Sequence, residues 1–146
     1  MSMNYFFAAF PQDMIDAMEE DNSLIDKYVF EDHAAMETTD VGTAWDVLSH
    51  VLKGAGFHAG DFVEDTLSNG GFLMSADELK SQANLLKRYS RDELFAKVTN
   101  ISDSADLYWL DFYKDDEDTL LEEFDKLIAF YQTAAEKNLG AVHYPA

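Results

Sequence analysis

The chain has 146 residues and a net charge of −19 at pH 7, because ten Lys and Arg stand against twenty-nine Asp and Glu. Hydrophobic residues make up 47% of it and include eleven Phe, seven Tyr and two Trp, too much apolar side chain for a disordered acidic segment. We therefore expect one folded domain over residues 1–146. Its negative field should repel nucleic acid and anionic membranes and attract a basic protein partner.

The absence of cysteine excludes a disulfide framework, a thiolate metal site and a thiol nucleophile. The opening MSMNYFFAAF is apolar but carries no basic residue, and Asp13 and Asp16 follow too soon for an export signal or a membrane-spanning helix. We expect a cytoplasmic protein that does not bind membranes.

Residues 3–10 are apolar at both odd and even positions, which is typical of a strand buried on both faces. Pro11 ends this strand and can open a short helix over residues 11–21, where Met14, Ile15 and Met18 form an apolar stripe. The sequence thus predicts a buried strand followed directly by an amphipathic helix.

A second helix is predicted over residues 41–54, with Asp40 as its N-cap and Gly54 as its stop. Five of the seven glycines then fall between Gly54 and Gly71, which indicates a loop. A short strand is expected over residues 70–75.

Two capping boxes predict two successive helices. Ser75 with Glu78 opens a helix over residues 76–89, and Ser90 with Glu93 opens another over residues 91–98. Residues 107–113, LYWLDFY, are aromatic at both parities and are interpreted as a strand or a packed loop.

The last helix is predicted from Asp115 to Gly140, and residues 141–146 form a closing strand. Strands at both ends of the chain, with helices between them, predict a sheet in which the two termini lie near one another under a cover of helices. The fold class is mixed α and β.

The segment YKDDEDTLLEEFD at 113–125 is strongly acidic. Carboxylates at the start of a helix stabilise it through its dipole, and this accounts for the run without any function. A surface that attracts a basic partner is the other reading. Phe130 lies off the apolar stripe of the last helix, so it is either covered by another element or exposed as an anchor.

Several segments together resemble the YfbM-like family of small bacterial proteins. They are the opening MSMNYFFAAF, DVGTAWDVLSHVLKG at 40–54, the two capped helices, LYWLDFY, the acidic run and LIAFYQTAAEKNLGAVHY. Where relatives often carry lysine and histidine, this chain has Thr43 and Ser49. The resemblance implies a three-layer α/β sandwich with a small mixed sheet, but no chemistry, since the family's function is unknown.

Small acidic bacterial proteins of this kind resemble, in size and charge, the immunity proteins that neutralise toxins delivered between bacteria. We predict a non-enzymatic binding protein, specifically an immunity-type inhibitor of a basic toxin domain, with no metal and no cofactor. The predicted partner-binding residues are Trp109, Asp111, Tyr113, Asp115, Asp116, Asp118, Glu122, Glu123 and Phe130.

Two other functions stay open. An enzyme or small-ligand domain would place its site near the glycine-rich loop 54–71, using His58 and Asp61 or carboxylates that folding brings together. His58 and Asp61 would need two further ligands from elsewhere to hold a metal. A nucleic-acid mimic would need carboxylates spaced like phosphates over an extended face.

Overall fold

Five strands form one sheet in the order β2-β1-β5-β4-β3, with every neighbouring pair antiparallel. This is a computed structural model, and it describes residues 3–67 and 70–146. The strands are β1 (Tyr5–Pro11), β2 (Glu37–Asp40), β3 (Asp61–Val63), β4 (Gly71–Met74) and β5 (Leu139–Pro145). The expectation of a mixed sheet is therefore wrong. The chain returns through β5 in the direction opposite to β1, so the backbones of Asn4 and Ala146 exchange hydrogen bonds of 3.0 and 2.9 Å.

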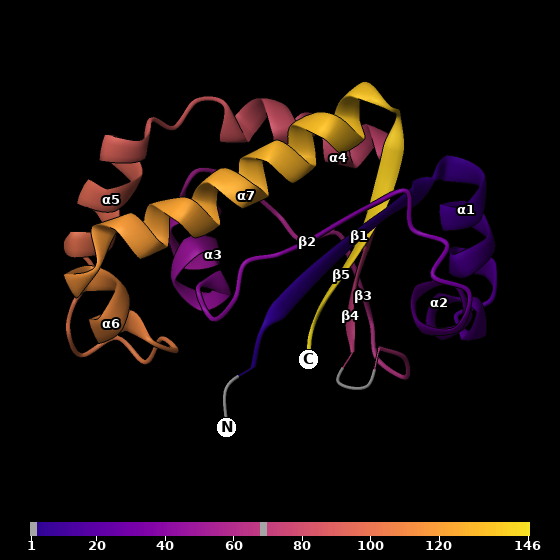
Figure 1. Cartoon of the computed structure of the whole chain (residues 1–146), viewed down its shortest axis with the longest axis horizontal. Coiled ribbons are helices and arrows are strands. Elements are labelled where there is room, and N and C mark those ends of the chain that lie inside the picture. The colour runs from indigo at the N-terminus through magenta and orange to yellow at the C-terminus, as the bar shows by residue number, and fades with distance from the viewer. Residues whose placement is uncertain (1–2, 68–69) are drawn as a thin grey trace.

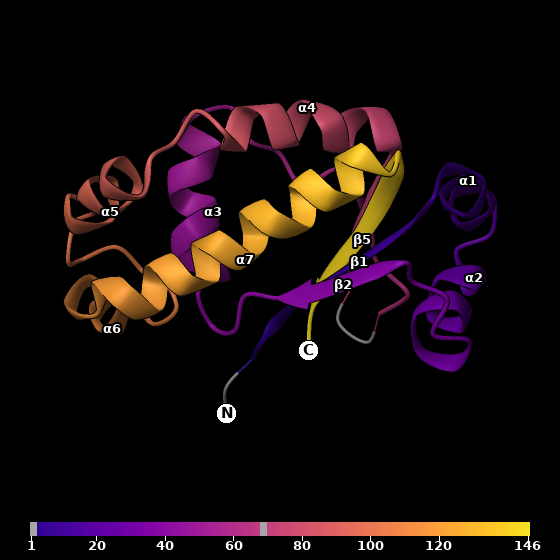
Figure 2. The ribbon, with the colours of Figure 1, turned by 45° about the horizontal axis from the view of Figure 1, so that its top comes forward.

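Helices lie on both faces of this sheet, which confirms the mixed α and β class (Figure 1). Short helices α1 and α2 pack on one side, and α3, α4 and the long α7 on the other; α5 and α6 lie at the end of the molecule farthest from α1 (Figures 1 and 2). No helix in residues 3–67 and 70–146 combines the length and the apolar run needed to cross a membrane. The bounds are α1 (Gln12–Glu20), α2 (Ser23–Asp26), a π-helix η1 (Lys27–Glu31), α3 (Trp45–Gly54), α4 (Ala76–Leu86), α5 (Arg91–Thr99), α6 (Leu110–Asp115) and α7 (Glu117–Glu136).

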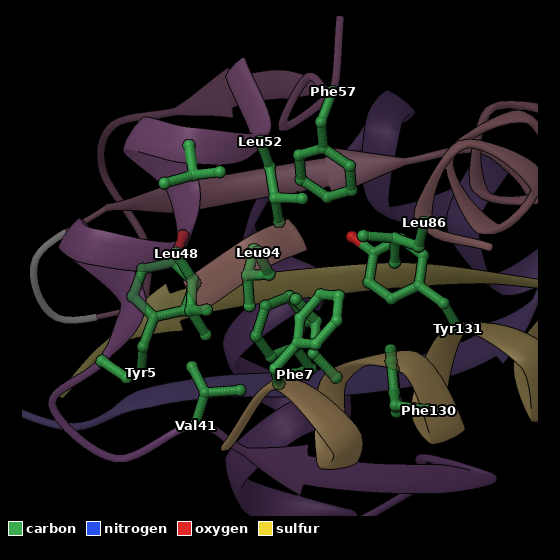
Figure 3. Packing of buried hydrophobic residues seen from close by; sticks show 14 of the residues in the cluster. Tyr5, Phe7, Val41, Leu48, Leu52, Phe57, Leu86, Leu94, Phe130 and Tyr131 are labelled. Atoms are coloured by element: carbon green, nitrogen blue, oxygen red, sulfur yellow. The ribbon is translucent and has the colours of Figure 1, made fainter. Parts of the chain in front are cut away.

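The central strands are buried on both faces, as the apolar run at residues 3–10 predicted. Phe7 and Ala9 belong to a large hydrophobic cluster that the sheet shares with α3, α4, α5 and α7 (Figure 3). Ala8 and Phe10 point to the other face, where a smaller cluster includes Ile15 of α1. Because successive side chains of a strand alternate between faces, one strand contributes to both clusters.

Local capping signals are confirmed. The Ser75 hydroxyl oxygen accepts from the Glu78 backbone N–H, and that of Ser90 accepts from the Glu93 backbone N–H, each at 3.1 Å. The Asp116 carboxylate likewise accepts from the Thr119 N–H at 3.1 Å and starts α7. Part of the acidic run is thus the beginning of a helix, as its first reading proposed.

Three local predictions are wrong. Asp40 does not cap α3, which begins only at Trp45; its carboxylate accepts instead from the Gly42 N–H at 3.0 Å and holds the turn after β2. Residues 107–113 contain the start of helix α6 and no strand. The last helix ends at Glu136, because Asn138 takes a left-handed conformation with φ of 58° that turns the chain into β5. The segment between α1 and α3 also holds α2, η1 and β2, which had not been predicted.

We expect Gly140→Ala to destabilise the protein by about 1–3 kcal/mol, because a Cβ there would overpack the core. That atom would lie 2.5 Å from the Met74 carbonyl oxygen and 2.7 Å from the Ile15 side chain. Gly54→Ala is the matched control, since a Cβ at Gly54 meets nothing within 4 Å. Urea denaturation of both variants measures the difference, and equal free energies of unfolding would contradict this account of β5.

Candidate functional site

A pocket of about 500 Å³ opens on the α3 side of the sheet, at the end where residues 4 and 146 pair. Its walls come from the start of β1, the turn before α3, the first residues of α3, the β3–β4 hairpin and the residue before Trp109. Five aromatic side chains and one carboxylate dominate the lining: Tyr5, Trp45, Phe62, Phe72, Tyr108 and Asp46. It is the natural place to look for a ligand.

The strand register explains why aromatic rings gather here. Phe7 of β1 lies opposite His143 of β5, His143 opposite Phe72 of β4, and Phe72 opposite Phe62 of β3. Residues that lie opposite each other in antiparallel strands point to the same face. These four side chains therefore form a row across the sheet, which we call the ring row, and Phe62 and Phe72 at its outer end line the pocket.

His143 occupies the middle of the ring row. Its imidazole stacks between Phe7 and Phe72, with ring centroids 5.0 and 5.2 Å away and interplanar angles of 23° and 22°. Trp45 approaches edge-on at 5.7 Å. The imidazole is fully buried, so its two nitrogens need partners within the protein.

Both nitrogens of His143 have a partner, and together the partners fix the tautomer. Nε2 lies 2.7 Å from the Ala59 carbonyl oxygen, which can only accept, so Nε2 carries the proton. Nδ1 then accepts from the Tyr5 hydroxyl at 2.7 Å. Burial lowers the pKa of His143 to about 4, with the Ala59 hydrogen bond acting in the opposite direction. The imidazole is neutral near pH 7.

Tyr5 connects the ring row to the pocket. Its ring stacks on Trp45 at 4.7 Å, and burial, helped by the nearby Asp46 carboxylate, raises the pKa of its hydroxyl. Asp46 is held in place because its carboxylate accepts from the Tyr108 backbone N–H at 3.2 Å. A tyrosine that resists ionisation beside a neutral, enclosed histidine is suited to a structural role more than to acid–base chemistry.

A second feature lies at the start of α6, next to the pocket. Tyr108, Trp109 and Phe112, which we call the aromatic patch, are 37%, 39% and 43% exposed. Their rings touch in sequence, with centroids 6.1 and 5.2 Å apart. Trp109 has a φ of 61°, a left-handed conformation that bulky residues rarely adopt. Tyr108 belongs to the patch and also lines the pocket, so the two features adjoin.

Of the three predicted aromatic anchors, one is at the surface. Trp109 is exposed, whereas Tyr113 and Phe130 are buried, so their side chains are not available to a partner in this conformation. The Tyr113 hydroxyl is 2.6 Å from the Thr43 hydroxyl. Phe130 packs against Phe7 with ring centroids 5.6 Å apart. The reading of Phe130 as covered by another element is the one the structure supports (Figure 3).

The predicted acidic residues divide into two groups. Asp116 caps α7, and Glu123 forms an ion pair with Lys126 at 2.8 Å, so both have structural partners. The others are exposed and spread along α6 and the first turns of α7: Asp111, Asp115, Asp118 and Glu122.

His58 and Asp61 do not form a site. Both are exposed, and Asp61 points to the opposite face of the sheet from the pocket. On that face the pKa of Glu19 is raised, mainly by burial and next by the charge of Asp61. In the part of the chain that the structure describes, His, Asp and Glu side chains do not assemble into a group of three that could hold a metal ion. The glycine-rich segment contributes Phe62, Gly70 and Gly71 to the pocket instead.

Sequence reasoning missed the residues that build the pocket. Tyr5 and Phe72 were interpreted only as parts of strands, and Trp45 and Asp46 only as parts of a helix. A histidine within an apolar strand was the one available signal, because a buried imidazole needs two polar partners. The partners, Tyr5 and Ala59, could not be found without knowing the strand order.

His143 makes stability depend on pH. Its pKa is about 6.5 in the unfolded chain and about 4 in the folded one, so the unfolded state binds a proton first as pH falls. The stability that neutral His143 contributes is fully present above pH 6.5. As pH falls toward 4, the free energy of unfolding decreases by up to roughly 3 kcal/mol. Replacing both partners of the hydrogen bond, with Tyr5→Phe and His143→Phe, should flatten this part of the profile in urea denaturation. His50→Gln, at an exposed histidine, is the control, and an unchanged decline in the double variant would contradict the assignment.

Comparisons with known proteins agree with the fold. The chain aligns with the crystal structure of YfbM from Escherichia coli, described as a protein of unknown function, over 100% of both chains, with a TM-score of 0.62 and 16% identity. No curated protein sequence matches. A family model, described as a domain of unknown function, DUF1877, matches residues 1–144. The resemblance noted from the sequence is thereby confirmed, and this chain belongs to the DUF1877 family.

Proposed function

We propose that this protein is a non-enzymatic binding protein that uses the α6 end of the molecule to hold a basic protein. In its most specific form the proposal is an immunity-type inhibitor of a basic toxin domain, acting in the cytoplasm. The observation that carries it is the aromatic patch, three touching aromatic side chains exposed together beside exposed carboxylates.

Exposed aromatic residues that touch one another favour a protein interface. Tyr and Trp are enriched among the residues that dominate binding energy, because they bury a large area with few rotatable bonds. Trp109 and Phe112 are large enough to serve as anchors and are more than a third exposed. The patch replaces the anchor set predicted from the sequence, keeping Trp109 and exchanging the buried Tyr113 and Phe130 for Tyr108 and Phe112.

The backbone at Trp109 supports the same conclusion. A left-handed conformation for a residue other than glycine costs about 1 kcal/mol or more, and such strain is retained most often at functional positions. At Trp109 the strained residue carries an indole ring that remains 39% exposed. Binding to a partner is the use that would offset this strain.

The negative charge of this surface favours a positively charged partner. Asp111 and Asp115 are exposed on α6, and Asp118 and Glu122 continue the acidic surface onto α7. With a net charge of −19, the protein attracts positive partners over a long range and speeds their approach at low salt. Three aromatic rings among these carboxylates favour a protein surface over the row of regular charges that a nucleic-acid mimic needs.

The aromatic patch predicts which variant loses the partner. With the purified protein as bait in a lysate of its host, a basic protein should be retained in stoichiometric amount by the native chain and lost by Trp109→Gly with Phe112→Ala. We expect this variant to stay folded, because glycine relieves the left-handed strain and both side chains are exposed. Phe30→Ala, at an exposed phenylalanine near α2, is the matched control. Equal retention by all three baits would exclude this surface.

The exposed acidic residues of α6 predict an effect on the rate at which the partner associates. Asp111→Lys with Asp115→Lys should slow association with the captured partner about 10-fold at low salt and weaken its salt dependence, with a smaller effect on dissociation. Glu20→Lys with Glu136→Lys makes the same change in net charge at helix ends away from α6, where lysine is well tolerated. Stopped-flow association measures both, and equal slowing would mean that only total charge matters.

A further inference from the structure

The pocket on the α3 side of the sheet has a lining that selects for one class of ligand. Its volume of about 500 Å³ is within the range of small-molecule sites. Five of the residues that line it are aromatic, and among the described residues that line it Asp46 is the only Asp, Glu, Lys, Arg or His. The pocket therefore combines one carboxylate, the polar side chains of Asn4 and Thr43, and several aromatic walls.

Aromatic rings and a carboxylate both favour positive charge. The face of an aromatic ring is electronegative and attracts ammonium and guanidinium groups within about 6 Å of its centre. Asp46 adds a full negative charge beside Tyr5, and the net charge of −19 repels anions from the opening. An anionic ligand is thus disfavoured by the ring faces, by Asp46 and by the negative charge of the rest of the chain.

The apolar walls narrow the class further. A small hydrated cation would lose its water here without gaining enough oxygen ligands, since a single carboxylate cannot replace a hydration shell. A cation that carries methyl or methylene groups loses less favourable hydration when it binds. Its carbon surface would also be buried against Trp45, Phe62 and Phe72. A quaternary or methylated ammonium, or an alkylated guanidinium, fits both the charge and the surface.

The pocket is built before any ligand arrives. Trp45 is stacked on Tyr5, Tyr5 donates to His143, and His143 is stacked on Phe72. Phe72 in turn meets Phe62 with ring centroids 5.4 Å apart. Rings held by such a chain of contacts lose little freedom when they bind a ligand, which increases affinity. Phe62 remains 60% exposed at the rim, where a ligand would cover it.

We propose that this pocket binds an organic cation, a methylated ammonium or an alkylated guanidinium, between its aromatic walls and the Asp46 carboxylate. The cation is either a free small molecule or the charged end of a polypeptide side chain. The proposal does not require the basic protein partner proposed above, although the two surfaces adjoin at Tyr108.

Choline and its neutral isostere 3,3-dimethyl-1-butanol test the charge preference directly, because they share shape and differ in the central atom. Titration is followed by the indole N–H resonances of the two tryptophans in NMR spectra of the native chain, with Trp109→Phe assigning which resonance is Trp45. We expect the Trp45 resonance to shift with choline and to require at least 5-fold more of the neutral compound. Equal affinity for the two compounds, or no shift with millimolar choline, overturns the proposal.

Variants of the walls separate a true site from general attraction to an acidic protein. Asp46→Asn keeps the acceptor for the Tyr108 N–H and removes the charge, and Phe62→Leu keeps bulk and removes the ring. Each should weaken choline binding, Phe62→Leu by about 2- to 5-fold, the range of an exposed cation–π contact. Phe30→Leu, at an exposed phenylalanine on the other side of the sheet, should leave it unchanged. An unchanged affinity for choline in both the Asp46→Asn and the Phe62→Leu variants overturns the proposal.

A pentapeptide containing trimethyl-lysine distinguishes the two sources of the cation. Tighter binding than choline assigns the site to a polypeptide side chain, and equal or weaker binding assigns it to a free small molecule; both results support the ligand chemistry. The aromatic-patch variant, Trp109→Gly with Phe112→Ala, serves as a further control, since it should lose the protein partner and retain choline. Failure of one proposal is in this way distinguishable from failure of the other.

Discussion

The burial of His143 between Phe7 and Phe72 is the constraint on which the rest of the structure depends. An imidazole without partners in this interior would destabilise the fold by several kcal/mol. It is accommodated because Tyr5 donates to one nitrogen and the Ala59 carbonyl accepts from the other. These bonds connect β5 to the beginning of β1 and to the segment before β3. One side chain therefore joins the strands of the sheet's centre to the glycine-rich segment beside it.

The same arrangement leaves one end of the sheet open. Helix α7 and helix α4 contribute to the large cluster, while at the end near Asn4 the start of α3 and Tyr108 line a pocket. The ring row continues across this opening, so aromatic faces line a pocket where a core would otherwise close. A buried polar group at the centre and an aromatic pocket at the edge are two results of a single strand register.

Some carboxylates of this chain have local structural partners in addition to contributing to its net negative charge. Asp116 caps a helix, Asp40 holds a turn, and Glu123 pairs with Lys126. Each of these carboxylates has a partner close to it in the chain. The exposed acids of α6 are different, since Asp111 and Asp115 lie on the same short helix as Phe112, whose side chain also reaches solvent. The helix-start explanation of the acidic run is thus correct for Asp116, and the surface explanation remains our proposal for its exposed neighbours.

Local signals in the sequence were sufficient for the strands at both ends, the capped helices and the start of α7, because a cap or an apolar period depends on residues within a few positions of one another. They could not place Tyr5 against His143, which are 138 positions apart and meet only through the order of the strands. Phe130 shows that local signals have the same limit in a helix. The helical period placed it off the apolar stripe, yet α7 also packs against β2 at the edge of the sheet and so buries a wider arc than one stripe. Local sequence thus determined the two end strands and the capped helices, whereas α2, β2 and α6 became visible only in the tertiary structure. The pairing of β1, β5 and β4 decided which side chains form the core, which line the pocket and which remain at the surface.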